Sequence, residues 1–63
     1  MRELNTRPNV ASADDFYALL LEAHEGLDKA ESDAFNARLI LILANHIGDR
    51  EVLAQALEAA KRK

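Results

Sequence analysis

The sequence predicts an all-α protein of three short helices that follow an extended N-terminal arm and assemble as an oligomeric helical bundle. Apolar side chains recur at helical spacing in three stretches, and capping residues and glycines mark the ends of those stretches. The chain has only 63 residues and no cysteine. We therefore expect one helical domain over residues 1–63, with assembly as its additional source of stability.

The opening residues 1–11 lack a helical period, and Pro8 disfavours helical geometry at Arg7. We expect this segment to be an extended arm that Leu4 and Val10 pin to the rest of the chain.

The first helix is expected over residues 13–25. Ser12 is placed as its N-cap, Asp15 follows three residues later as in a capping box, and Gly26 supplies a left-handed stop. Its apolar side chains cover an arc of roughly 200°: Phe16, Tyr17, Leu19, Leu20, Leu21 and Ala23.

The second helix is expected over residues 29–47, between an Asp28 cap with Glu31 three residues on and a stop at Gly48. One polar line, formed by Glu31, Arg38 and Asn45, runs along it. Most of its remaining circumference is apolar: Phe35, Leu39, Ile40, Leu41, Ile42, Leu43 and Ile47. Residues 39–43 also fit a buried strand, but no second strand-like segment exists to pair with them.

The third helix is expected over residues 49–61, with Asp49 as its cap. It carries one apolar stripe: Val52, Leu53, Ala56, Leu57 and Ala60. Because both inter-helix turns are only two or three residues long, consecutive helices should be neighbours at sharp angles, as a helical hairpin plus a third helix.

Composition excludes several classes of function. The formal net charge of −3 is opposite to the basic footprint of a nucleic-acid binder. The apolar run 39–44 is too short to span a bilayer, and the N-terminus lacks a signal-peptide pattern. Ser12 and Ser32 are both explained by helix starts, so no catalytic, cofactor-binding or metal-ligating set is predicted. We expect a cytoplasmic protein that is not an enzyme and binds neither nucleic acid nor membrane.

Four polar side chains stand out within or beside the apolar faces. His24 and His46 are interpreted as hydrogen-bonded core or interface residues, with a ligand or a pH switch as the alternative. Asn36 fits either a satisfied amide near the solvent edge or a residue that fixes helix register. Arg38 fits either the solvated line or a partner's carboxylate.

The predicted interface combines the apolar faces of the first two helices with these polar groups. Its apolar members and His46 are Phe16, Leu20, Phe35, Leu39, Ile42, Leu43, His46 and Ile47. Asn36 and Arg38 are its polar or register-setting members.

Four segments of the sequence carry a family resemblance. They are Leu-Asn-Thr-Arg-Pro-Asn at 4–9, Asp-Asp-Phe-Tyr at 14–17, Ala-His-Glu-Gly-Leu at 23–27 and Asn-Ala-Arg-Leu-Ile-Leu-Ile-Leu-Ala-Asn-His-Ile-Gly-Asp at 36–49. The chain resembles the short bacterial proteins called domain of unknown function 2783. The resemblance implies no established activity. It implies at most an accessory role beside a flavin-dependent aromatic hydroxylase or another catabolic enzyme.

The leading functional hypothesis is a non-catalytic protein–protein interaction module that self-associates through its central helix, with a dimer favoured. The alternative is a small accessory subunit that docks on an enzyme such as a flavin-dependent or other aromatic-catabolism oxidoreductase. A second alternative is a helix-turn-helix-like regulatory DNA binder, suggested by the spacing of Ala44, Gly48 and Leu57. Glu51 and Glu58 on the presumptive recognition helix argue against DNA binding.

Overall fold

The computed structural model describes residues 3–62 and contains three α-helices in that range. They are α1 (Ala13–His24), α2 (Lys29–Ile47) and α3 (Arg50–Ala60). No strand occurs among the described residues. The predicted all-α class and the order of its elements are therefore confirmed.

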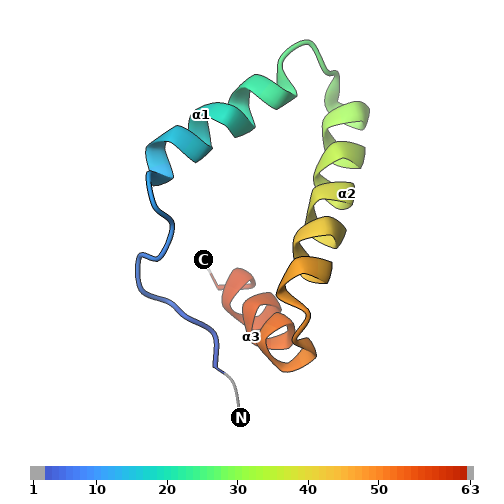
Figure 1. The fold of residues 1–63 in the computed structure, drawn as a ribbon. Helices are drawn as coiled ribbons and strands as arrows, with labels where there is room; N and C mark the ends of the chain where they lie inside the picture. The colour runs from blue at the N-terminus through green and yellow to red at the C-terminus, as the bar shows by residue number, and fades with distance from the viewer. Residues whose placement is uncertain (1–2, 63) are drawn as a thin grey trace.

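The helices form an open frame (Figure 1). α1 and α2 meet at the turn between them and then diverge, so the predicted hairpin is an open one. α3 turns sharply away from the far end of α2, and the N-terminal arm runs back from α1 toward α3. The backbone N–H of Leu4 donates to Oε1 of Gln55 at 2.9 Å. This hydrogen bond ties the arm to α3, whereas Val10, the other predicted anchor, is exposed.

The N-caps of α2 and α3 are the residues that the sequence predicts, Asp28 and Asp49. Oδ1 of Asp28 accepts from the backbone N–H of Glu31 at 2.8 Å, and Oε1 of Glu31 accepts from the backbone N–H of Asp28 at 3.0 Å. Oδ1 of Asp49 accepts from the N–H groups of Glu51 and Val52. These bonds satisfy amides that a helix start otherwise leaves unpaired.

The predicted capping box at the start of α1 is wrong. Ser12 precedes the helix as expected, but its backbone is left-handed, with φ 56° and ψ 56°, and its side chain makes no capping hydrogen bond. A side-chain N-cap needs extended backbone geometry. At Ser12 only the carbonyl takes part, accepting from the N–H groups of Asp15 and Phe16 at 3.0 and 3.1 Å.

Residues 3–62 form no closed core. No described residue is buried, and the best-protected apolar side chains are only half-buried. The radius of gyration is 13.4 Å, against about 10.6 Å for a compact chain of this length. The accessible surface of 5,941 Å² compares with about 4,000 Å² for a compact protein of this mass. The helices thus hold apolar faces apart instead of packing them together.

Candidate functional site

The main candidate site is an apolar groove between α2 and α3. It has a volume of about 490 Å³. Every residue that lines it is aliphatic: Ile40, Leu43, Ala44, Ile47, Leu53, Ala56, Leu57 and Ala60. The helical period places the four α2 residues on one face and the four α3 residues on another. The sharp turn at Gly48, which has φ 67°, brings these two faces together at an angle.

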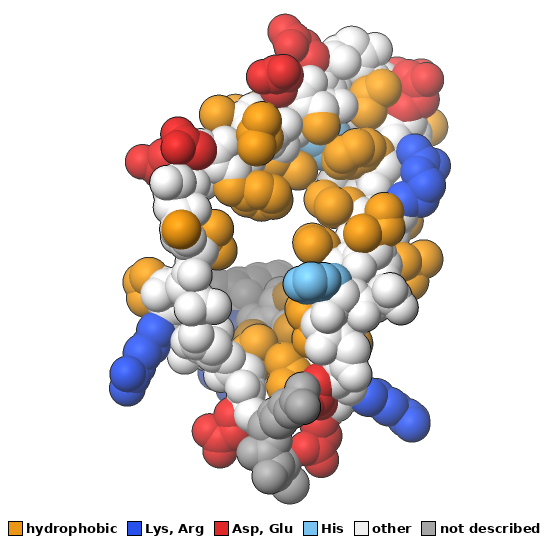
Figure 2. All heavy atoms as spheres, viewed as in Figure 1, with side chains coloured by type: hydrophobic (Ala, Val, Ile, Leu, Met, Phe, Trp, Pro, Cys, Tyr) orange, Lys and Arg blue, Asp and Glu red, His pale blue; other side chains and the backbone are white. Residues whose placement is uncertain are grey.

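A second apolar surface borders the opening between α1 and α2, where hydrophobic side chains gather on both helices (Figure 2). Of the predicted interface residues, Phe16 and Leu20 belong to α1, and Phe35 and Leu39 belong to α2. Leu20, Phe35 and Leu39 are half-buried, whereas Phe16 is exposed. The sequence therefore selected residues that lie on the two facing helices, although the helices do not close over them.

The outer part of α2 is also apolar. Leu41 is 70% exposed and Ile42 is 65% exposed. Both are positions where a helix in a compact monomer would carry polar side chains. Ile42, a predicted interface residue, is therefore mostly uncovered by the described part of its own chain.

The predicted interface set omitted most of the groove. Leu43 and Ile47 were included, but Ile40, Ala44 and the α3 residues were not. The apolar stripe of α3 is the signal that could have identified these residues. Because the shortest turn joins α3 to α2, the stripe is expected to face α2.

His24 connects α1 to α2 through both ring nitrogens. Nε2 donates to Oδ1 of Asn36 at 3.0 Å. Nδ1 lies 3.0 Å from Oγ of Ser32, and in the neutral tautomer protonated at Nε2 the serine hydroxyl donates to it. The imidazole also meets the ring of Phe35 edge-on, with centroids 4.8 Å apart. We call His24, Ser32, Phe35 and Asn36 the histidine clasp.

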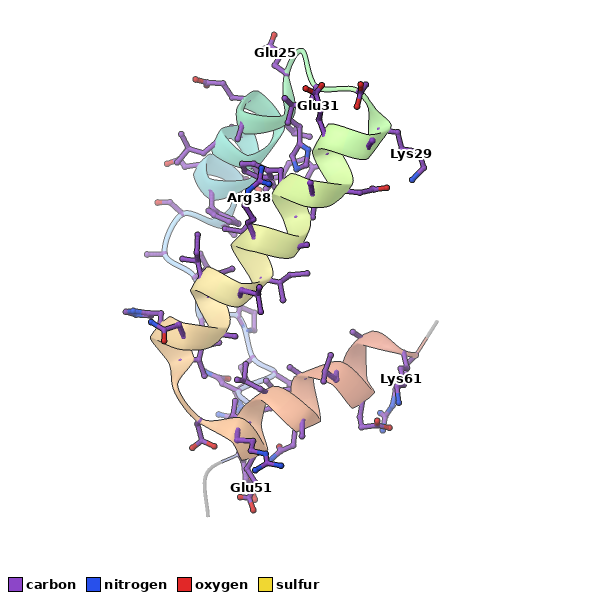
Figure 3. The ribbon with its side chains drawn as sticks, turned by 90° about the vertical axis from the view of Figure 1, so that its right-hand side faces the viewer. Glu25, Lys29, Glu31, Arg38, Glu51 and Lys61 are labelled. Carbon is purple, nitrogen blue, oxygen red and sulfur yellow. The ribbon has the colours of Figure 1, made fainter. Side chains whose placement is uncertain are left out.

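Of the other predicted polar residues, Asn36 belongs to the clasp, whereas Arg38 and His46 lie outside it. Asn36 is exposed, and its Oδ1 accepts from Nε2 of His24. His46 and Arg38 are exposed on α2. Figure 3 views α2 from the side that faces away from α1, and Arg38 lies on that side. The carboxylate of Glu31 is engaged by its own helix start.

The order Ser32, His24, Asn36 resembles the relay of a nucleophile, a base and an orienting group. Such a relay also requires space for a substrate and donors for a developing oxyanion. None of the clasp residues lines the groove between α2 and α3. The arrangement accounts for a structural link between two helices, and it supplies no further component of a hydrolytic site.

Residues 3–62 contain neither a cluster of metal-binding side chains nor a membrane-spanning helix. No three histidine, cysteine or acidic side chains come together in a set able to hold a metal ion. In the same range, no helix combines the length and apolarity required to cross a bilayer.

Comparison with known proteins identifies one family. The family described as "Protein of unknown function (DUF2783)" matches residues 4–62. Neither the curated proteins nor the solved structures contain a match to the chain. The match covers all three helices and most of the arm.

Proposed function

We propose that this chain, which belongs to the DUF2783 family of proteins of unknown function, is a non-catalytic interaction module that self-associates through α2. The supporting observation is the absence of any buried residue in the described chain, together with exposed aliphatic side chains along α2. Burial of apolar surface is the main favourable term in folding, so a second copy would supply the burial that one copy lacks.

The amount of surface fits an obligate assembly. The chain exposes about 1,900 Å² more than a compact protein of its mass. If each of two chains covered this excess, the interface would total about 3,800 Å², which falls in the range of obligate homodimers.

The first test is the mass of the purified chain at micromolar concentration, measured by sedimentation or light scattering. We expect twice the 7.0 kDa chain mass. A folded monomer at this concentration would contradict the proposal.

The second test introduces a charge into the proposed interface. Ile42→Asp or Leu43→Asp should dissociate and unfold the chains together, because an obligate dimer has no stable monomer. Asn45→Asp is the matched control, since it places the same side chain on the polar line of the same helix and should leave the assembly intact. Equal effects at all three positions would contradict the assignment.

The alternative occupant of the same surface is a larger enzyme subunit, for which this chain would act as an accessory. The apolar groove between α2 and α3 would serve that role equally well. The native complex, isolated with its components identified, discriminates the two. Recovery of self-assembled chains alone supports the module, and recovery of a defined enzyme subunit in fixed ratio supports the accessory role.

A further inference from the structure

If the chain self-associates as proposed above, part of a second copy fills the groove between α2 and α3. α1 carries apolar side chains that the described part of its own chain leaves exposed. Leu20 and His24 face α2 and are half-buried, whereas Phe16 and Leu19 remain exposed. Phe16 and Leu19 form a stripe with Ala23 at positions i, i+3 and i+7, which is the spacing that a helix presents to a groove. We call Phe16, Leu19 and Ala23 the α1 stripe.

The dimensions of the stripe and the groove agree. The α1 stripe extends over eight residues, with about 10 Å of helix between its first and last members. The α3 wall of the groove runs from Leu53 to Ala60 and has the same length. Both surfaces are built from side chains on one helical face, so each offers a ridge or a trough of about two turns.

The charges beside these surfaces are complementary. By helical spacing, Asp15 and Glu22 border the α1 stripe, and α1 has no lysine or arginine. Arg50 and Lys61 occupy the corresponding border of the α3 wall, next to Leu57. Figure 3 shows Lys61 at the C-terminal end of α3. Both side chains of its ion pair with Glu58, at 2.8 Å, are exposed. Lys61 can therefore exchange Glu58 for another carboxylate at little cost.

We propose that α1 of one copy lies in the groove between α2 and α3 of a second copy, antiparallel to the α3 of that copy. The α1 of the second copy makes the same contact with the groove of the first. The α1 stripe then meets Leu43, Leu53 and Leu57. Asp15 lies beside Lys61, at the C-terminus of the other copy's α3. Glu22 lies beside Arg50, at the N-terminus of the same helix. The antiparallel direction also sets the positive end of the α1 dipole against the negative end of α3. A two-fold axis relates the two contacts.

Site-directed cross-linking tests this arrangement, because the chain has no cysteine of its own. Leu19→Cys in one tagged chain and Leu57→Cys in a differently tagged chain are mixed and oxidised. These positions are 63% and 65% exposed, so both variants should keep their fold, which circular dichroism checks. We expect a disulfide-linked dimer that carries both tags.

The matched control is Leu21→Cys mixed with Leu57→Cys. Leu21 is 54% exposed and projects from the side of α1 opposite the stripe, so we expect little mixed product. A second pair of mixtures tests whether α1 lies antiparallel to the α3 of the other copy. Phe16→Cys should link to Ala60→Cys in preference to Leu53→Cys.

Besides the absence of the expected cross-link, three results would overturn the proposal. The first is equal cross-linking from Leu21→Cys. The second is a preference of Phe16→Cys for Leu53→Cys. The third is closure at monomer mass of a chain that carries both Leu19→Cys and Leu57→Cys, because α1 would then cover its own groove. A dimeric wild-type chain without the expected cross-link overturns only this docking mode, whereas a monomeric wild-type chain overturns the proposed function as well.

Charge reversal provides an independent readout. Asp15→Lys with Glu22→Lys should weaken self-association by about tenfold, and so should Arg50→Glu with Lys61→Glu. Mixing the two double variants should restore association between unlike chains. Asp14→Lys with Glu25→Lys makes the same charge change on the other side of α1 and should have a smaller effect. Failure of the mixture to associate would contradict the assigned ion pairs.

Discussion

The imidazole of His24, on α1, contacts three residues of α2. Ser32, Phe35 and Asn36 are three and four residues apart, so they share one face of α2 and meet a single incoming side chain. Each nitrogen of the ring has a partner 3.0 Å away, and the ring edge adds an aromatic contact. The clasp therefore sets the angle at which α1 leaves α2, with little help from packing elsewhere between these helices.

Removal of the clasp should destabilise the fold. We expect His24→Ala to lower the free energy of unfolding by about 1–3 kcal/mol, because it deletes two hydrogen bonds and an aromatic contact. Urea titration at fixed chain concentration measures the change. Combined with Asn36→Ala in a double-mutant cycle, it should give a coupling energy of about 0.5–1.5 kcal/mol. Additive effects would show that this hydrogen bond contributes nothing to stability.

The two predicted capping boxes should behave differently when truncated. Asp28→Ala removes a side chain that accepts from Glu31, and we expect a loss of about 1 kcal/mol. Ser12→Ala removes a hydroxyl that makes no capping bond, so it should cost no more than about 0.5 kcal/mol. Thermal or urea unfolding of both variants provides the comparison. Equal losses would contradict the left-handed geometry of Ser12.

The sequence signal for a cap consists of residue types and spacing, and it carries no information on backbone angles. Asp28 and Glu31 satisfy the signal and adopt extended and helical geometry in turn. Ser12 and Asp15 satisfy it equally well, yet Ser12 has φ 56°. The direction in which the arm arrives at α1 depends on contacts made by Leu4, eight residues earlier, and a local pattern cannot report that.

At the scale of elements, the three helices begin and end within about one residue of the predicted positions. Helix ends are fixed by local features: acidic caps at Asp28 and Asp49, and left-handed glycines at Gly26 and Gly48. The angles between helices have a different origin. They follow from the path of each short turn and from the histidine clasp, so the groove between α2 and α3 was not predicted although the side chains of both its walls were recognised as apolar.

Gly48 tests the turn that shapes the groove. Its φ of 67° is costly for a residue with a side chain, although a Cβ would meet only the Asn45 carbonyl oxygen at 3.7 Å. We expect Gly48→Ala to destabilise the fold by about 1–2 kcal/mol through backbone strain alone. Gly48→Asn should cost less, because asparagine tolerates this region better. Equal unfolding midpoints for the alanine variant and the wild type would contradict the left-handed turn.

At the scale of the whole molecule, the sequence predicted that one chain has too little mass to enclose its apolar helix. The structure agrees in a specific way, since the described residues are all at least partly exposed and the frame measures 41 × 26 × 25 Å. Composition and periodicity report how much apolar surface exists and on which faces. They do not report which faces remain open, because that depends on the inter-helix angles.

The proposed self-association predicts that stability depends on chain concentration. For a dimer whose unfolding is coupled to dissociation, a tenfold rise in chain concentration adds about 1.4 kcal/mol. This corresponds to an increase in Tm of about 5 °C for some 126 residues. Thermal unfolding followed by circular dichroism over two decades of concentration measures it. A Tm that does not change with concentration would indicate a monomeric folding unit.

The open frame has a consequence for the life of the protein after synthesis. A newly made chain without a partner presents its aliphatic helix to chaperones and proteases, and its helices can open locally at little cost. If the chain assembles as proposed, chains made in excess of their binding sites should be degraded, whereas assembled ones should persist. The steady level of the protein would then depend on the supply of binding sites as much as on its own rate of translation.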